Sequence, residues 1–176
     1  MKATGVVRRI DELGRIVIPK EIRKNLRIRD GENIEIYTDI NNNIILKKFS
    51  IVKRLGDFAQ NFTDSIYSFL KHNILITDTD HIIAASGSLK KYLNKDISDD
   101  LLLSIKRREN ILEKHPKKIK IIEDEELEGT YVINSIFVNS DVVGLVIILS
   151  TEKQITELEE RIAGIASQFL SKYLDG

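Results

Sequence analysis

The first fifty residues most restrict how this chain can fold, because they contain several strand patterns but too few residues for an independent core. Short runs typical of strands occur at residues 5–10, 15–18, 33–38 and 44–48. A unit this small needs a disulfide, a metal or a partner chain to be stable. The chain has no cysteine, and its first histidine is His72. The sequence therefore predicts that residues 1–50 fold together with a second chain.

Charge is divided unevenly along the chain, although Lys and Arg balance Asp and Glu overall, at 27 each. Residues 1–50 hold eleven cations and seven acids, whereas residues 51–176 hold sixteen cations and twenty acids. Such asymmetry suggests that one part of a chain meets a polyanion. The alternative interpretation is a basic surface that binds nothing.

The cations of the first part gather around one turn, DELG at residues 11–14. Gly14 relaxes the backbone of this turn, and Arg15 follows it at the start of a strand. Further cations precede the turn or follow it on a short helix: Lys2, Arg8, Arg9, Arg23 and Lys24. Long cationic side chains held by a rigid loop suit contacts with phosphates and base edges in a DNA groove.

The hydrophobic period changes at Ile51, from the alternation of strands to the spacing of helices. One helix is predicted over residues 51–72, with apolar positions at Leu55, Phe58, Phe62, Ile66 and Phe69. Another is predicted over residues 152–173, with a capping box at Thr151 and Gln154 and apolar positions at Leu158, Ile162, Ile165 and Phe169. Both stripes are close to a heptad repeat, which favours a bundle shared with a second copy over packing within one domain alone.

Between these helices the sequence predicts strands and one polar helical segment. The strands are expected at residues 73–77, 81–86, 118–122, 130–138 and 141–149, and the helical segment at 88–115. The acidic run 123–128 is interpreted as a solvated loop, and Asn139-Ser140 as a tight turn between the last two strands. Residues 51–176 are therefore predicted to form an α+β domain with an antiparallel sheet flanked by helices.

The segment TGVVRRIDELGRIVIPKEIRKNLRI, with GENIEIYTD and IILKK after it, resembles the DNA-binding domain of AbrB-type transition-state regulators. The resemblance covers residues 1–50. It implies a swapped-hairpin barrel, in which two chains interleave to form one dimeric DNA-binding unit. It also implies double-stranded DNA as the partner, contacted by the matching cations Arg8, Arg15, Arg23 and Lys24, with Arg9 and Lys2 as additions.

The whole chain resembles members of this family that join an AbrB-type head to a C-terminal GAF domain and regulate late, spore-forming transcription. KHNILITDTDHIIAASG, at residues 71–87, is similar to the first strand pair of a GAF domain. The resemblance implies a homotetramer with two kinds of dimer contact. One contact would lie in residues 1–50, and the other would use the helices that flank the GAF-like domain.

Two interpretations of the GAF-like domain stay open: a sensor of a small molecule, and an oligomerisation module with a vestigial pocket. No cofactor is indicated, and a ligand would be unidentified. If a pocket exists, the sequence suggests Asp78, Asp80 and Ser86 beside a wall formed by residues 88–115. Two alternative functions also stay open: an antitoxin-like module that binds a toxin, and an architectural DNA-binding protein without a ligand.

No catalytic residue is assigned, and we expect a protein that is not an enzyme. A turn between two strands explains Asp78 and Asp80 without chemistry. The three histidines, at 72, 81 and 115, lack the spacing of metal ligands, so no metal site is expected. The first residues lack a signal-peptide pattern, and the longest apolar run, residues 142–149, is too short to span a bilayer. We therefore expect a bacterial cytoplasmic protein associated with the nucleoid and not with a membrane.

Overall fold

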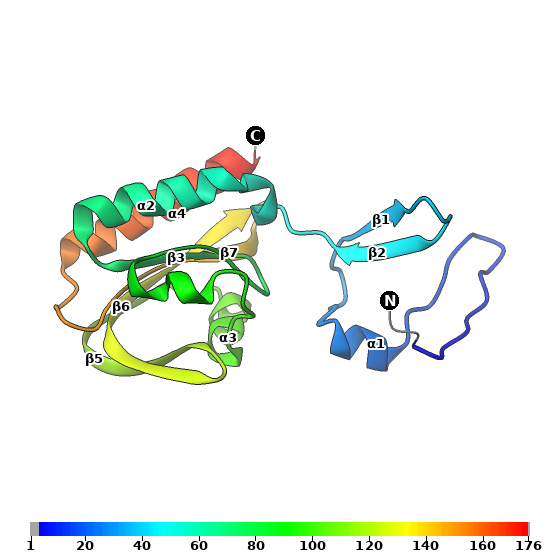
Figure 1. The fold of residues 1–176 in the computed structure, drawn as a ribbon, viewed down its shortest axis with the longest axis horizontal. Coiled ribbons are helices and arrows are strands. Elements are labelled where there is room, and N and C mark those ends of the chain that lie inside the picture. Colours follow the sequence, from blue (N-terminus) through cyan, green and yellow to red (C-terminus); the bar gives the residue numbers. More distant parts are fainter. Residues whose placement is uncertain (1–3, 176) are drawn as a thin grey trace. The chain divides into compact units, whose positions relative to one another are not determined.

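The structure, a computed structural model, describes residues 4–175 and divides the chain into two units, Met1–Phe49 and Ser50–Gly176 (Figure 1). The sequence pattern placed this division after residue 50. Among the described residues, no helix has both the length and the apolar character needed to cross a membrane.

The N-terminal unit contains one short helix and one hairpin. Helix α1 (Lys20–Asn25) begins directly after Pro19. Strands β1 (Ile34–Thr38) and β2 (Ile44–Lys48) pair antiparallel, as the sequence predicts. Their turn is closed by Asp39, whose carboxylate accepts hydrogen bonds from the backbone N–H groups of Asn41 and Asn43, both at 2.9 Å.

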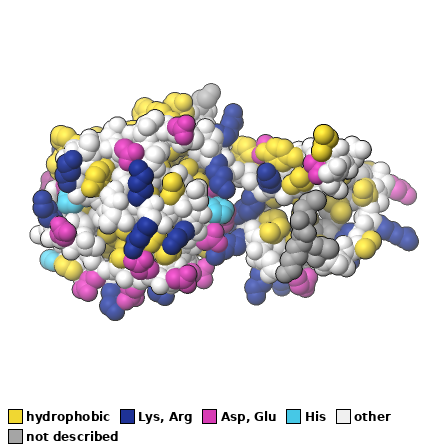
Figure 2. All heavy atoms as spheres, viewed as in Figure 1, with side chains coloured by type: hydrophobic (Ala, Val, Ile, Leu, Met, Phe, Trp, Pro, Cys, Tyr) yellow, Lys and Arg dark blue, Asp and Glu magenta, His cyan; other side chains and the backbone are white. Residues whose placement is uncertain are grey.

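This unit has no hydrophobic core in a single chain, because none of residues 4–49 is buried. Val7 is 87% exposed and Ile36 is 68% exposed. Figure 2 shows hydrophobic side chains lying at the surface among the charged ones. Apolar surface of this kind is stable in water only when another surface covers it. The fold of one chain is therefore consistent with the expected need for a partner.

The strands predicted at residues 5–10 and 15–18 are wrong for the single chain. Figure 1 draws this dark-blue stretch without arrows, and neither segment belongs to a described sheet. The physical reason is that a strand is defined by hydrogen bonds to a neighbour. A single chain offers these two segments no neighbouring strand, whereas β1 and β2 have each other.

The C-terminal unit is built on a five-stranded antiparallel sheet with the strand order β4-β3-β7-β6-β5. The strands are β3 (Asn73–Thr77), β4 (Ile82–Ser86), β5 (Ile111–Ile122), β6 (Glu125–Val138) and β7 (Asp141–Ser150). The predicted tight turn between β6 and β7 is confirmed, because Asn139 and Ser140 both have positive φ, at 49° and 68°.

Helices cover both faces of this sheet (Figure 1). Helices α2 (Asp57–Leu70) and α4 (Glu157–Asp175) lie on one face, and the 3-10 helix η2 (Gly87–Tyr92) and α3 (Asp99–Arg107) lie on the other. Neighbouring residues of β7 point to opposite faces, so Ile147 packs with the η2 and α3 side and Val146 with the α2 and α4 side. Burial on both faces explains why β7 reads as a continuous apolar run.

Two predictions for the middle of this unit are wrong. Residues 111–115 belong to the long strand β5 and not to a helix, which ends at Arg107. The acidic run is a turn only at residues 123 and 124, because β6 begins at Glu125. Its carboxylates face the lysines of β5 across the pair, and Lys118 bonds Glu126 at 2.7 Å. These cross-strand pairs of opposite charge therefore stabilise the start of β6, although its acidic residues have a low propensity for strands.

The predicted flanking helices are shorter than expected. Gly56, with φ of 47°, separates the 3-10 helix η1 (Val52–Leu55) from α2. The N-terminal cap of α4 is not at Thr151 but at Thr156, whose backbone N–H and hydroxyl both donate to the Glu159 carboxylate, at 2.7 and 2.6 Å. Leu55 consequently lies outside α2 and is buried, with 5% exposed.

Helix α2 also closes one edge of the sheet. The side chain of Gln60 donates to the carbonyl oxygen of Ala85 at 2.9 Å and accepts from its N–H at 3.2 Å. Ala85 lies in β4, the edge strand. The amide side chain therefore occupies the hydrogen-bonding groups that a further strand would otherwise use.

Candidate nucleic-acid interface

The turn at residues 11–15 is held by one carboxylate. Asp11 Oδ1 accepts hydrogen bonds from the backbone N–H groups of Leu13 and Arg15, at 3.0 and 2.8 Å. The backbone closes the same turn, with the Asp11 N–H donating to the Arg15 carbonyl at 3.0 Å. Gly14 occupies a left-handed conformation, with φ of 75°, which suits glycine. The turn is therefore a defined loop, as the sequence predicts.

The Arg15 side chain is fixed at one end and exposed at the other. Its Nε donates to Asp11 Oδ2 at 2.7 Å, and the side chain is 72% exposed. Hydrogen bonds from Arg15, first from its backbone N–H and then from its side chain, hold the pKa of Asp11 below its ordinary value. The carboxylate therefore stays charged at neutral pH and keeps the guanidinium in place.

The side chains of the other predicted cations differ in whether they are exposed or paired with an acid. Arg8 and Arg9 are exposed, and an Nη of Arg8 donates to the neighbouring Val7 carbonyl at 3.2 Å. Lys24 is exposed on α1. Arg23 is instead paired with Asp30 at 2.7 Å. Lys2 lies outside the described residues.

The Arg23 pair makes this arginine a weaker candidate than Arg15. Its guanidinium is engaged by Asp30 through an Nη atom, whereas the guanidinium of Arg15 is bonded, among the described residues, through Nε alone. The Arg23 Nε is buried without a partner among the described residues. Part of the Arg23 side chain is thus turned into the unit and away from solvent.

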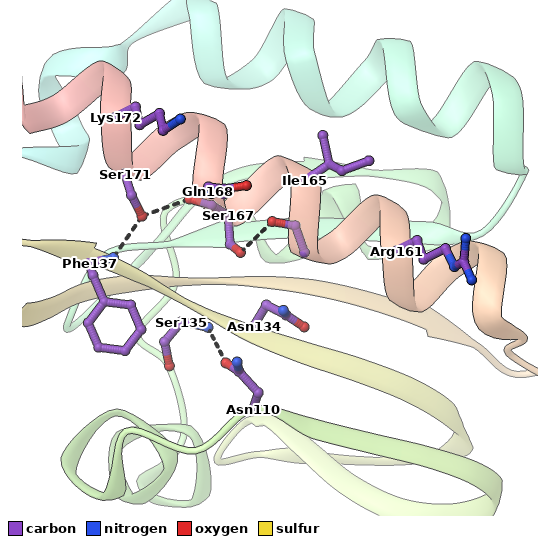
Figure 3. A pocket seen from close by; sticks show the side chains of 11 residues that line it. Asn110, Asn134, Ser135, Phe137, Arg161, Ile165, Ser167, Gln168, Ser171 and Lys172 are labelled. Carbon is purple, nitrogen blue, oxygen red and sulfur yellow. Dashed lines mark hydrogen bonds between the residues drawn. The ribbon is translucent and has the colours of Figure 1, made fainter.

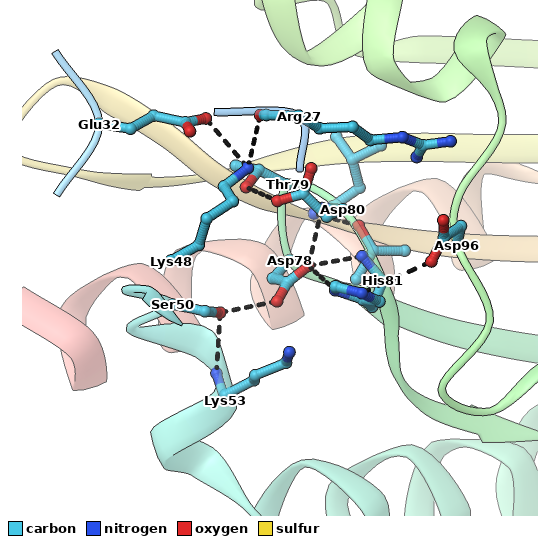
Figure 4. Close-up of polar contacts among 12 residues, drawn as sticks. Arg27, Glu32, Lys48, Ser50, Lys53, Asp78, Thr79, Asp80, His81 and Asp96 are labelled. Atoms are coloured by element: carbon cyan, nitrogen blue, oxygen red, sulfur yellow. Dashed lines mark hydrogen bonds and ion pairs between the residues drawn. The ribbon is translucent and has the colours of Figure 1, made fainter. Parts of the chain in front are cut away.

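Other polar residues of this unit have structural roles that sequence reasoning missed. Lys48 of β2 bonds the Glu32 carboxylate at 3.2 Å and the Arg27 carbonyl at 3.0 Å (Figure 4). Glu32 also accepts from the backbone N–H of Arg29 at 2.9 Å. This network ties the segment after α1 to the end of the hairpin.

The residues suggested for a ligand pocket make structural hydrogen bonds. Asp78 Oδ1 accepts from the backbone N–H groups of Asp80 and His81, at 2.8 and 2.6 Å, and Oδ2 accepts from the Ser50 hydroxyl at 2.7 Å (Figure 4). Ser86 donates to Asp64 at 2.6 Å. These contacts stabilise the β3–β4 turn and the attachment of α2, so the ligand role of these residues stays a prediction.

A groove of about 670 Å³ lies elsewhere, between α4 and β6 (Figure 3). Two hydrogen bonds of 2.9 Å stabilise its wall, from the Ser135 N–H to Asn110 and from the Phe137 N–H to Ser171. Arg161 and Lys172 add two cations to its rim. None of the three residues suggested for a ligand pocket lines this groove.

Helices α2 and α4 share an exposed aromatic surface. Phe58 stacks on Tyr173 with ring centroids 4.9 Å apart, and Phe62 stacks on Phe169 at 5.6 Å. Several apolar side chains of these helices are exposed: Phe69, Leu158, Ile165, Phe169 and Tyr173. Among the helix residues predicted to meet a second copy, Phe58, Phe62, Ile66 and Ile162 are half-buried, while Leu55 is buried within its own unit.

Within residues 4–175, no group of three or more His, Asp or Glu side chains is arranged to hold a metal ion. The buried His72 lies 3.6 Å from Glu159, which also caps α4. This pair joins the end of α2 to the start of α4 and gives His72 a structural partner.

Both units match known families. Residues 54–175 match the family described as stage V sporulation protein T C-terminal, transcription factor. Residues 7–54 match the family described as antidote-toxin recognition MazE, bacterial antitoxin.

Two relatives match the chain, one along almost its whole length and one over 49 residues. Stage V sporulation protein T of Bacillus subtilis (strain 168) is 44% identical over 178 residues, covering 99% of each chain. The transition state regulatory protein AbrB of the same organism is 55% identical over 49 residues, which are 28% of this chain and 50% of the relative.

The C-terminal unit is similar in fold to a solved GAF domain, that of an Acinetobacter phosphoenolpyruvate-protein phosphotransferase. The TM-score is 0.56 at 13% identity, with 73% of this chain and 84% of that chain covered. The predicted combination of an AbrB-like N-terminal domain with an antiparallel α+β GAF-like domain is confirmed.

Proposed function

Because the chain belongs to the family of stage V sporulation protein T, we propose that it is a DNA-binding transcription regulator of sporulation-stage genes. The observation that carries this proposal is the 44% identity along 99% of both chains, since it extends over both units. The protein would act in the cytoplasm, on the nucleoid, and no catalytic step is assigned to it.

The DNA-binding face is proposed to centre on the loop at residues 11–15. Arg15 presents its exposed guanidinium at this loop, and Arg8, Arg9 and Lys24 add exposed charge. Contacts from such cations to phosphates would supply most of the affinity and make it depend on salt. The Nη atoms of Arg15 suit hydrogen bonds to base edges, which would add sequence preference.

The N-terminal unit is proposed to be a dimer of interleaved chains. Its lack of any buried residue between 4 and 49 supports this, together with the absence of a sheet partner for residues 5–10 and 15–18. A second copy would cover the apolar side chains and offer the missing strand neighbours. Each dimer would then present the Arg15 loop twice.

The C-terminal unit is proposed to join such dimers into a tetramer through the aromatic surface of α2 and α4. The stacked pairs Phe58–Tyr173 and Phe62–Phe169 form a rigid apolar platform at the surface. Aromatic surfaces with low conformational freedom are typical of interface centres. Sensing of a small molecule by the same unit remains the second proposed role, without an assigned ligand.

An antitoxin is the alternative function, and one observation favours it: the match of residues 7–54 to an antitoxin family. The tail of such an antitoxin is flexible until it binds the toxin. Residues 50–176 instead form a folded unit with a continuous buried core. The folded second unit therefore supports the regulator over the antitoxin.

The test is a salt titration of DNA binding by fluorescence anisotropy, using duplexes that the full-length protein selects from a random-sequence pool. We expect Arg15→Ala to weaken binding about tenfold or more and to reduce the salt slope by about two, one for each copy of the loop in the dimer. The matched control is Lys106→Ala, which removes an exposed cation from α3 in the other unit. Equal binding by wild type and Arg15→Ala would contradict the proposed DNA-binding face, and a pool without a consensus would favour an architectural protein.

A further inference from the structure

The contact between Asp11 and Arg15 has a consequence for DNA recognition that the cations alone do not predict. Asp11 is an acid at the centre of the proposed DNA-binding face. An acid there repels phosphates, so by charge alone its removal would tighten binding. Its geometry argues for the opposite effect, because it is bonded to the side chain that would contact DNA.

The Asp11 carboxylate uses its two oxygens for different tasks. Oδ1 accepts from two backbone N–H groups and shapes the turn, whereas Oδ2 accepts from Arg15 Nε and from no other group in residues 4–175. Among the described residues, no other group is bonded to the Arg15 side chain. Both Nη atoms, the paired donors at the end of the guanidinium, are therefore free.

A guanidinium held through Nε keeps its outer pair of donors intact. The two Nη atoms match the paired acceptors of a guanine edge or a phosphate, and this match requires a fixed plane. A free arginine would lose side-chain freedom on binding, which weakens binding by a factor of about two to ten. In this loop, much of that freedom is already lost before DNA arrives.

We propose that Asp11 is a positioning residue for DNA recognition, which orients the Arg15 guanidinium so that its Nη atoms face the DNA. This inference rests on the proposed DNA-binding function and deepens it. Asp11 does not touch DNA itself, and its effect on affinity passes through Arg15.

The test uses Asp11→Asn in the full-length protein. An asparagine keeps Oδ1 as an acceptor for the Leu13 and Arg15 N–H groups, but it replaces the charged partner of Nε with an amide. The turn is therefore retained while the guanidinium is released. Hydrogen exchange of the Leu13 and Arg15 amides checks that the turn persists.

The matched control is Glu12→Gln, which removes one negative charge from the same loop. Glu12 is exposed and bonds no described residue, so its removal reports the charge effect alone. We expect Glu12→Gln to leave DNA affinity unchanged or to raise it about twofold. We expect Asp11→Asn to lower affinity about two- to tenfold, a change of opposite sign.

A double-mutant cycle separates positioning from a general structural role. In the Arg15→Ala background, Asp11→Asn should no longer weaken binding, because the side chain that it orients is gone. Affinity equal to or above wild type for Asp11→Asn, with the turn intact, would overturn the inference. The same weakening with and without Arg15 would also overturn it, since the effect would then not pass through Arg15.

The two single variants distinguish a wrong positioning role of Asp11 from a wrong DNA-binding face. If Arg15→Ala alone leaves affinity unchanged, the proposed DNA-binding face is wrong and the inference falls with it. If Arg15→Ala weakens binding but Asp11→Asn does not, the face stands and only the positioning role is wrong.

Discussion

The two units of this chain reach stability in different ways. None of residues 4–49 is buried, whereas every buried apolar residue lies between Val52 and Leu170. The second unit covers both faces of its sheet with its own helices, and the first leaves its strand segments and apolar side chains uncovered. One chain thus combines a domain that has its own core with a domain that, in the single chain, has no buried residue between 4 and 49.

The largest expected effect concerns the two units as separate fragments. A fragment of residues 1–49 should unfold on dilution, because its fold is linked to association, and its Tm should rise with protein concentration. A fragment of residues 50–176 should change its Tm much less over the same range. Circular dichroism melts at several concentrations measure both, and a concentration-independent Tm for the first fragment would contradict the comparison.

A second prediction tests the core of the C-terminal unit. Ile147→Ala in the 50–176 fragment should lower the free energy of unfolding by about 2–5 kcal/mol, because a side chain with no exposed surface leaves a cavity. The control is Leu103→Ala on α3, where the side chain is 42% exposed. This substitution should change the free energy of unfolding by about 0.5 kcal/mol or less. Urea unfolding measures both, and equal costs at the two positions would show that the core is not organised as described.

A third prediction sharpens the difference between the two kinds of association. Ile165 is 67% exposed on α4, beside the aromatic surface. Ile165→Lys should weaken tetramer formation by about 2 kcal/mol or more, because a lysine charge would lose hydration in the interface. It should leave the N-terminal dimer intact, so that light scattering reports dimers in place of tetramers.

The control for this prediction is Leu103→Lys, which places the same charge on the opposite face of the sheet. It should leave the tetramer unchanged. A tetramer that survives Ile165→Lys would mean that α2 and α4 are not the contact.

The smallest expected effect depends on pH and lies within the second unit. The hydrogen bond from Ser86 is the main cause that lowers the pKa of Asp64 from its ordinary value of 3.8. Since the folded state holds the proton less tightly, this contact stabilises the fold above pH 3.8 and is lost as the pH falls through the lower folded value. Ser86→Ala should therefore reduce stability at pH 7 and flatten its fall at acid pH.

Urea unfolding of the 50–176 fragment at pH 7 and near pH 3 checks this prediction. The control is Ser68→Ala, since the Ser68 hydroxyl donates to the backbone carbonyl of Ser65 and bonds no carboxylate of the described residues. A stability difference between wild type and Ser86→Ala that is the same at both pH values would show that Asp64 is not the titrating group.

Sequence reasoning succeeded where a local pattern decides the structure. The hairpin of β1 and β2, the Asn139-Ser140 turn and the strand β3 each follow from a few neighbouring residues, and all are present. The turn that presents Arg15 was also predictable, because Asp11 and Gly14 are residues that favour turns. The Asp11–Arg15 bond was missed, although a spacing of four residues across a tight turn is a usable signal.

Sequence reasoning failed where distant partners decide. Residues 123–128 looked like a loop because they are acidic. The lysines of β5 that lie opposite their carboxylates can be recognised as partners only when the pairing of the two strands is known. Residues 5–10 and 15–18 have the apolar pattern of strands, but the described part of the single chain offers them no neighbouring strand. Gly56 interrupts the first flanking helix. The helical spacing of apolar residues continues on both sides of this glycine, so the spacing alone did not indicate the break.

The bond between Gln60 and the edge of β4 bears on how such a protein behaves at high concentration. A sheet with a free edge can recruit strands from other molecules and grow into polymers, and the two proposed contacts between copies of this chain would add to this hazard. With Ala85 occupied on both its N–H and C=O groups, the addition of a strand at that edge is blocked at this residue. One amide side chain thus disfavours the addition of strands at this edge, and assembly through the helix surface proposed above would then stay finite.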